Sequence, residues 1–280
     1  GRARNFDASY LLGNGDGCAF VVEGDEYDTA FFDKGPKFLH YRAQIAVLNN
    51  VEFDHADIYD DITEVIENFE RFTSSLGPET FLLVNGDDPI ALRCAASTAG
   101  ELLTYGFSEE CDLRASQLQT GPHGCQFTVH LPDGRTLAAR SAMAGRHNVW
   151  NALAAIGICI RLGVEPEAAI AGLSTFAGTQ QRQEELGEPD GVLVISDYAH
   201  HPTAIRETIA ALSARYPGRR LWSVYEPKSN TARRNIHQAA YVEAFVGAAL
   251  AACVKYEQLV HTVLDAEPKF VNLLARCCRV

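Results

Sequence analysis

The segment Cys18 to Tyr59 reads CAFVVEGDEYDTAFFDKGPKFLHYRAQIAVLNNVEFDHADIY. It contains two short apolar runs, at residues 19–22 and 45–48, which are partly β-branched as in the buried strands of a parallel sheet. Each run is followed by a segment of polar and charged residues, called here a polar burst. Ligands of open α/β sheets bind beyond the carboxyl ends of the strands. The segment therefore predicts two strands whose polar bursts share one crevice.

These polar bursts carry the side chains of a candidate metal site. Glu23-Gly24-Asp25-Glu26 follows the first run, and the second is followed by a segment with Asn50, Asp54 and His55. Oxygen ligands beside one imidazole suit a hard divalent cation such as Mg²⁺, which can also hold a phosphate. The alternative is a set of solvated loop acids, and the pattern alone does not decide between the two.

Composition narrows the class of protein. The chain has 280 residues, enough for roughly two domains of about 150 residues each. Its net charge of −12 disfavours a nucleic-acid or membrane-surface partner, so an anionic substrate needs a locally basic pocket. The eight cysteines form no C-x-x-C pair, which favours reduced thiols in the cytoplasm. No apolar run approaches the ~20 residues of a membrane span.

The remaining patterns predict an α/β fold in two domains. Further strands are expected at 81–84, 102–107, 192–195 and 221–225, and helices at 60–75, 89–93, 145–163, 166–173, 202–215 and 239–254. Alternation over 113–140 around Pro132-Asp133-Gly134 predicts an antiparallel hairpin region. The polar stretch 176–188 is a candidate hinge. We predict domains over 1–183 and 184–280.

The segment Gly145-Arg146-His147-Asn148, with Asn151, places amides in the first turn of a predicted helix. Asn148 and Asn151 are three residues apart and share a helix face. An amide offers both a donor and an acceptor, which matches the edge of adenine. The alternative is that Asn148 only caps the helix.

Two motifs in the second half follow predicted strands. Asp197-Tyr198-Ala199-His200-His201-Pro202-Thr203 has an acid that suits ribose hydroxyls and two histidines that suit a carboxylate or phosphate; the alternative is a polar loop with Thr203 as helix cap. Glu226-Pro227-Lys228-Ser229-Asn230-Thr231, with two following arginines, forms a positive patch for an acidic substrate; the alternative is a solvated charge run.

Together, and in this order, these stretches resemble the Mur ligase family, ATP-dependent enzymes that form amide bonds in cell-wall synthesis. The resemblance covers about residues 5–238 and is carried by EGDEYDTAFFDK, NNVEFDHADI, DYAHHPTAIR and EPKSNT. It implies a central ATP-binding domain with a mostly parallel sheet plus an antiparallel hairpin region. An incomplete Rossmann-like C-terminal domain follows. It also implies that this is an inactive fragment entering part-way through the central domain, without the family's UDP-binding domain.

The resemblance implies roles residue by residue. Glu23 and His55 would each hold a Mg²⁺ ion, with Asn50 and Asp54 shaping the second site. ATP would be bound at adenine by His147, Asn148 and Asn151, at ribose by Asp197 and at the γ-phosphate by Arg182. Catalytic roles would fall to His55, Arg182 and His200. Substrate contacts would come from Asn50, His201, Lys228, Ser229 and Asn230, with His200 also facing the incoming peptide.

The implied reaction joins UDP-N-acetylmuramate to the tripeptide L-Ala-γ-D-Glu-meso-diaminopimelate in peptidoglycan recycling, through an acyl phosphate in the cytoplasm. ATP and Mg²⁺ are the implied cofactors, with no nucleic-acid or membrane partner. Three alternatives stay open. They are a UDP-N-acetylmuramate–L-alanine ligase, a non-catalytic remnant that binds nucleotide or precursor, and a metal-dependent phosphohydrolase using Glu23, Asp54 and His55.

The chain departs from the family pattern at several points. It has no G-x-x-x-x-G-K-[ST] phosphate loop. Many relatives carry a carbamylated lysine on the helix after the NXXXDH motif, whereas residues 56–92 contain no lysine. Glu67 or Glu70 is a hypothetical replacement for that carboxylate. Gln181 and Ser196 stand where relatives usually have Arg and Asp.

Overall fold

A computed structural model describes residues 2–6, 8, 19–29, 33–227, 229–234 and 236–253. The chain divides into two compact units. Tyr10–Phe176 forms one, called here the central unit, and Gly1–Ser9 with Ala177–Val280 forms the other, called the terminal unit. Each unit is described by itself.

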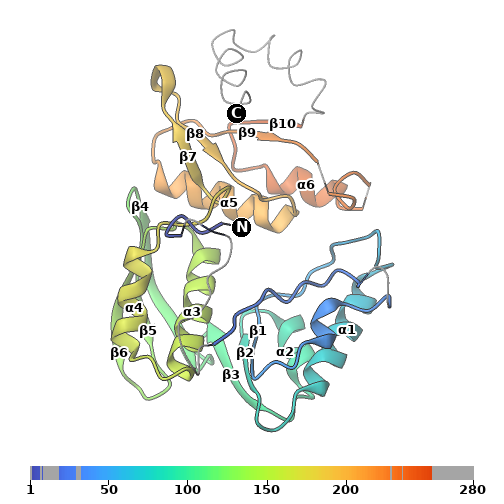
Figure 1. The fold of residues 1–280 in the computed structure, drawn as a ribbon. Coiled ribbons are helices and arrows are strands. Elements are labelled where there is room, and N and C mark those ends of the chain that lie inside the picture. The colour runs from blue at the N-terminus through green and yellow to red at the C-terminus, as the bar shows by residue number, and fades with distance from the viewer. Residues whose placement is uncertain are drawn as a thin grey trace. The chain divides into compact units, whose positions relative to one another are not determined.

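The central unit is built on one six-stranded sheet in the order β1-β2-β3-β4-β5-β6 (Figure 1). The strands are β1 (Ile45–Leu48), β2 (Phe81–Asn85), β3 (Glu101–Gly106), β4 (Leu113–Gly121), β5 (Gly124–His130) and β6 (Thr136–Ser141). Neighbours from β1 to β4 pair in parallel, and β4-β5-β6 pair antiparallel. The predicted α/β class, with a mostly parallel sheet and an antiparallel hairpin region, is confirmed.

Strand β2 lies between two hydrophobic cores, one on each face of the sheet. Its alternate residues Phe81 and Leu83 face a core shared with α3 (Arg146–Arg161) and α4 (Pro166–Thr175). The intervening Leu82 and Val84 belong to the other core, beneath α1 (Ile62–Ser75) and α2 (Pro89–Ala95). All five residues of β2 are buried, because helices cover both faces of a parallel sheet.

Two helices of the central unit begin at acidic caps. The Asp61 carboxylate accepts hydrogen bonds from the Thr63 and Glu64 amides at the start of α1. Asp88 does the same for Ile90 and Ala91 in α2, where Pro89 occupies the first turn. A short 3₁₀ helix, η1 (Lys37–His40), precedes β1. The predicted helices over 60–75 and 89–93 are confirmed within a few residues.

The predicted strand at 19–22 is wrong. Residues 19–26 have no strand or helix, and the Phe20 and Val21 side chains are 88% and 79% exposed. An apolar run becomes a strand only where a neighbour completes its hydrogen-bond ladder. Among the described residues, no strand pairs with β1 on the edge away from β2. The segment Gly13-Asn14-Gly15-Asp16-Gly17, whose glycines predict a turn, lies outside the described residues.

The terminal unit contains two small sheets. Strands β7 (Glu184–Gly187) and β8 (Val194–Ser196) pair antiparallel, with η2 (Pro189–Gly191) between them. Strands β9 (Trp222–Tyr225) and β10 (Leu250–Cys253) pair in parallel. Helix α5 (Pro202–Arg215) and α6 (Gln238–Ala244) complete the unit, with a core of Ile205, Ile209, Tyr225 and Ala244.

Two expectations for the terminal unit need correction. The predicted helix over 239–254 ends at Ala244, because residues 250–253 pair with β9 instead. Strand pairing therefore overrides the helix propensity of this alanine-rich stretch. The polar stretch 176–188, the candidate hinge for which no strand or helix was predicted, includes β7, which pairs with β8.

Candidate nucleotide and metal site

The candidate site of the central unit lies at the carboxyl ends of β1, β2 and β3. Side chains at this edge connect the segments that leave the strands. The Asp88 carboxylate, after β2, accepts a hydrogen bond from the Val51 amide, after β1, at 2.8 Å. Within the sheet, the Tyr105 hydroxyl of β3 donates to the side-chain oxygen of Asn49. The edge is therefore cross-linked rather than a set of separate solvated loops.

His55 occupies a special position in this edge. Its backbone has a φ of 52°, in the left-handed region that few non-glycine residues adopt. The Asp54 carboxylate accepts a hydrogen bond from the His55 amide at 2.7 Å, which supports this conformation. The imidazole Nε2 lies 2.7 Å from Oε1 of Glu26, and the ring packs against Tyr27 with centroids 4.1 Å apart.

Opposing influences act on the pKa of His55. Burial is the largest single one and lowers the pKa, because it disfavours the charged imidazolium. The hydrogen bond to Glu26 and the negative charges of Asp54, Glu26 and Asp57 outweigh burial, and the net pKa is raised above the ordinary value. His55 therefore holds a proton more tightly than a solvated histidine does.

Glu26 belongs to the first polar burst, but sequence reasoning assigned the role of ligand to Glu23 and gave Glu26 none. Its carboxylate contacts His55, and its carbonyl oxygen accepts a hydrogen bond from the Tyr59 hydroxyl at 2.6 Å. The predicted magnesium ligand Glu23 is exposed and lies in the same polar burst. The signal was present in the sequence, since Glu26 follows Glu23 by three residues.

The residues around His55 fit a hard divalent cation in their chemistry. Carboxylate oxygens and one imidazole are suitable ligands for Mg²⁺, and a cation held by Glu26 and His55 would replace the proton between them. Within the described part of the chain, no group of three or more His, Cys, Asp or Glu side chains is already arranged as a metal site. The predicted Asn50 donates instead to Glu52 at 2.9 Å.

The first turn of α3 presents the predicted adenine ligands. The Asn148 amide nitrogen donates to the Ala144 carbonyl at 2.7 Å and lies 3.0 Å from Nε2 of His147. Both N–H groups of Asn148 are thus used inside the turn, and its side-chain oxygen is the atom suited to accept from an adenine amino group. Asn151 is exposed. Asn148 is not the N-cap, which is Gly145.

In the terminal unit, Asp197 is held firmly after β8. Its two carboxylate oxygens accept hydrogen bonds from the amides of Gln183 at 2.9 Å and Ala199 at 2.8 Å. Gln183 has a φ of 48°. The guanidinium of the predicted γ-phosphate ligand Arg182 lies over the Tyr198 ring, 5.4 Å from its centroid. The terminal unit therefore brings Asp197 and the Arg182 segment together.

The two adjacent histidines have different surroundings. His200 Nδ1 lies 3.1 Å from the Tyr198 carbonyl, while the hydroxyls of Tyr225 and Tyr241 both donate to the His200 carbonyl, at 3.0 and 2.8 Å. His201 is the N-cap of α5, where its Nδ1 accepts from the Thr203 amide at 3.4 Å. The helix cap is therefore His201 rather than Thr203, the residue considered for that role from the sequence.

The predicted positive turn after β9 is described only in part. Lys228 lies outside the described residues. The Ser229 hydroxyl accepts a hydrogen bond from the Ala232 amide at 3.1 Å, and the Asn230 side chain is exposed. Ser229 thereby fixes the turn, and Asn230 faces solvent from it.

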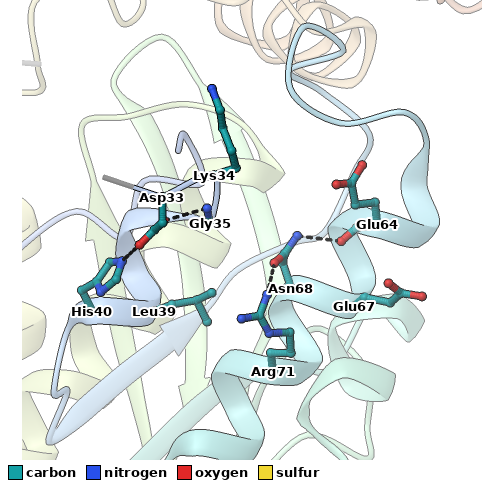
Figure 2. A pocket seen from close by; sticks show the side chains of 9 residues that line it. All are labelled: Asp33, Lys34, Gly35, Leu39, His40, Glu64, Glu67, Asn68 and Arg71. Carbon is teal, nitrogen blue, oxygen red and sulfur yellow. Dashed lines mark hydrogen bonds and ion pairs between the residues drawn. The ribbon is translucent and has the colours of Figure 1, made fainter. Parts of the chain in front are cut away.

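A cavity of about 630 Å³ lies between η1 and α1 (Figure 2). Side chains of both charge signs line it, including Lys34, Arg71 and Glu67. Of the two glutamates considered as a replacement carboxylate, Glu67 lies on this wall, whereas Glu70 pairs with Arg93 of α2 at 3.1 Å. The two glutamates therefore face different surroundings.

The fold and these motifs define the chain as a member of an enzyme class. The Mur ligase middle domain matches residues 18–159, and the Mur ligase glutamate ligase domain matches residues 181–267. The chain belongs to the Mur ligase family. No helix among the described residues has the length and apolar character needed to cross a membrane.

Particular relatives fall into two groups by name. The chain is 37% identical over 234 residues to the UDP-N-acetylmuramate--L-alanyl-gamma-D-glutamyl-meso-2,6-diaminoheptandioate ligase of Escherichia coli, covering 83% of this chain and 50% of the relative. It is 37% identical over 227 residues to a UDP-N-acetylmuramate--L-alanine ligase of Nitratidesulfovibrio vulgaris, covering 81% and 48%. The chain spans about half the length of these curated relatives.

A solved structure supports the fold directly. The chain is similar to a murein peptide ligase from Psychrobacter arcticus, with a TM-score of 0.64 and 33% identity. The match covers 89% of this chain and 52% of that one.

Proposed function

We propose that this chain is part of a cytoplasmic ATP-dependent amide ligase that joins UDP-N-acetylmuramate to L-Ala-γ-D-Glu-meso-diaminopimelate. The observation that carries the proposal is the shared edge of the central sheet. The His55 loop follows β1, and the start of α3 reaches the same edge through a hydrogen bond from Trp150, in its second turn, to Asp87, after β2. A nucleotide and its metal suit the carboxyl ends of parallel strands.

In the proposed reaction the lactyl carboxylate of the sugar attacks the γ-phosphorus of ATP. A carboxylate O–P bond forms, the bond to ADP breaks, and an acyl phosphate results. The peptide amine then attacks the acyl carbon, a C–N bond forms, phosphate leaves and the amine releases a proton. Bound Mg²⁺ would supply charge neutralisation for the phosphates.

The chain's own residues have separate proposed tasks. Glu26 and His55 would hold one metal, and Glu23 remains the proposed ligand of the other. His147, Asn148 and Asn151 would bind adenine, with the Asn148 oxygen accepting from the amino group. Asp197 would bind ribose, and Arg182 the γ-phosphate.

His200 is the proposed acceptor of the amine proton. Its Nδ1 lies against the Tyr198 carbonyl, which can only accept, so the neutral ring carries its proton on Nδ1 and its lone pair on Nε2. His201, Lys228, Ser229 and Asn230 would contact the peptide, and Asn50 would shape the acceptor side of the metal site.

Phosphate release by the complete gene product tests the proposal. With ATP and Mg²⁺ present, release should require both UDP-N-acetylmuramate and the tripeptide. Release with L-alanine in place of the tripeptide would favour the alanine ligase, whose relatives match equally well. Release with neither acceptor would refute a ligase and favour a phosphohydrolase, and binding of nucleotide or precursor without any turnover would favour a non-catalytic remnant.

A further inference from the structure

The carboxylate of Asp87 lies at the junction of three elements. It follows β2, and its oxygens accept hydrogen bonds from the Phe107 amide at 2.7 Å and the Ser108 amide at 2.9 Å, both after β3. Its Oδ2 also accepts from the indole N–H of Trp150 in α3 at 2.7 Å. The side chain is only 13% exposed, so this anion depends on the three N–H donors around it.

Aromatic and cationic groups surround the same carboxylate. The Arg146 guanidinium lies 3.8 Å from Asp87 Oδ2 and 3.8 Å from the centroid of the Phe107 ring. The Phe107 and Trp150 rings meet edge to face, with centroids 5.8 Å apart. Arg146 and Trp150 are four residues apart and share one face of α3. The contacts therefore reach the first two turns of the helix from one side.

Helix α3 begins without a side-chain cap. Its N-cap, Gly145, has a φ of 100° and cannot supply a capping oxygen. By contrast, Asp61 and Asp88 cap α1 and α2. The start of α3 must therefore be held by other contacts, and the Trp150 hydrogen bond to Asp87, with Arg146 beside the same carboxylate, attaches it to the sheet edge.

The backbone of β3 comes close to the Asp87 carboxylate at Gly106, a residue without a side chain. Any Cβ added to Gly106 would lie 2.8 Å from the Asp87 carboxylate. A side chain at the end of β3 would therefore displace the carboxylate from the Phe107 and Ser108 amides.

We propose that Asp87 is a positioning residue for the nucleotide: through Trp150 it sets where the uncapped first turn of α3 presents His147, Asn148 and Asn151. This inference rests on the proposed nucleotide site, and Asp87 itself touches no substrate. Substitution of Asp87 should misplace the adenine ligands while leaving the residues around the peptide unaffected.

Steady-state kinetics of the complete gene product test this with Asp87→Asn and Trp150→Phe. Asparagine at position 87 places an N–H group where a carboxylate oxygen accepted a hydrogen bond, so at least one of the three N–H donors loses its acceptor. Phenylalanine at position 150 removes the indole N–H but keeps an aromatic ring. Both should raise KM for ATP by roughly ten- to a hundredfold, since small misplacements of binding groups have effects of this size. KM for the sugar nucleotide and the peptide should stay within about twofold.

A matched control is Asp112→Asn. Asp112 accepts from the amide and hydroxyl of Thr104 in β3, at 2.8 and 2.7 Å, but makes no bond to α3. It should leave KM for ATP unchanged. The double variant Asp87→Asn/Trp150→Phe should match the more affected single variant, because both changes break the same bond.

Three outcomes would overturn the inference in distinguishable ways. If Asn148→Ala raises KM for ATP but neither Asp87→Asn nor Trp150→Phe does, positioning by Asp87 is refuted and the nucleotide site stands. If Asn148→Ala leaves KM for ATP unchanged, the adenine site itself is wrong and the positioning role falls with it. A lower kcat with unchanged KM would show a purely structural role and would likewise refute the proposal.

Discussion

Replacing Glu26 with glutamine tests the charge arrangement at His55. The two side chains are 17% (His55) and 37% (Glu26) exposed, and their polar atoms are 2.7 Å apart. A hydrogen bond between charged groups contributes about 1.5–3 kcal/mol, and one pKa unit corresponds to about 1.4 kcal/mol. Because Glu26 is more than a third exposed, solvent screening favours the lower end. We therefore expect Glu26→Gln to weaken the interaction by about 1.5 kcal/mol and the pKa of His55 to fall.

Nuclear magnetic resonance of the imidazole C–H groups measures this pKa directly. His55→Gln identifies the resonance among the nine histidines of the chain. Asp25→Asn is the matched control, because Asp25 loses a charge in the same segment but bonds the Tyr27 amide and Lys37 instead of His55. An equal pKa for His55 in the wild type and Glu26→Gln, or an equal fall in Asp25→Asn, would refute the assigned pairing.

The same pair predicts a pH dependence of stability. The pKa of His55 is raised in the folded chain, so its stabilisation is fully present below the ordinary pKa near 6.5 and is lost as the pH rises through the folded value. Unfolding of the wild type in urea should show this loss, and Glu26→Gln should reduce it. Mg²⁺ binding at the pair should instead strengthen as the pH rises, since the metal competes with the proton.

Other predictions concern stability and are checked by chemical denaturation. Gly124→Ala should cost about 3 kcal/mol or more, because its φ is +100° and a Cβ would overlap the Ser141 carbonyl; Gly134→Ala, with a φ of +86° and open space, should cost about 1 kcal/mol. Equal costs would contradict the assigned overlap. Thr73→Val should cost about 1–3 kcal/mol, because the buried Thr73 hydroxyl donates to the Cys94 carbonyl; a neutral effect would contradict that.

The fold was predictable where the spacing of apolar residues agreed with the Gly, Asn or Pro residues that begin or end an element. Strand β2 reads as a continuous apolar run followed by Asn85-Gly86, and helix α5 begins at Pro202 as expected. Prediction failed where pairing decided the outcome. Residues 19–22 have the composition of a strand, yet no described strand pairs with them, and residues 250–253 became a strand only because β9 lies beside them. Neither relation is visible in local sequence.

The candidate site was predictable by segment but less so by residue. The polar burst after 19–22 was selected correctly as the neighbour of His55, but the contact comes from Glu26 rather than the proposed Glu23. The choice depends on how the chain turns between residues 23 and 28, where the Asp25 carboxylate accepts from the Tyr27 amide at 2.9 Å. Such a local bond sets which side chain faces inward, and spacing alone does not determine it.

The turn after β2 does more than end the strand. Its two adjacent acids act in different directions: Asp88 accepts from the Val51 amide and caps α2, whereas Asp87 accepts from Trp150 of α3. The loop that carries His55 and the helix that carries Asn148 are thus both attached to one short turn. Because strand β2 is buried along its whole length, that turn has a rigid base. The proposed metal ligand His55 and the proposed adenine ligand Asn148 can therefore keep a fixed separation without contacting each other.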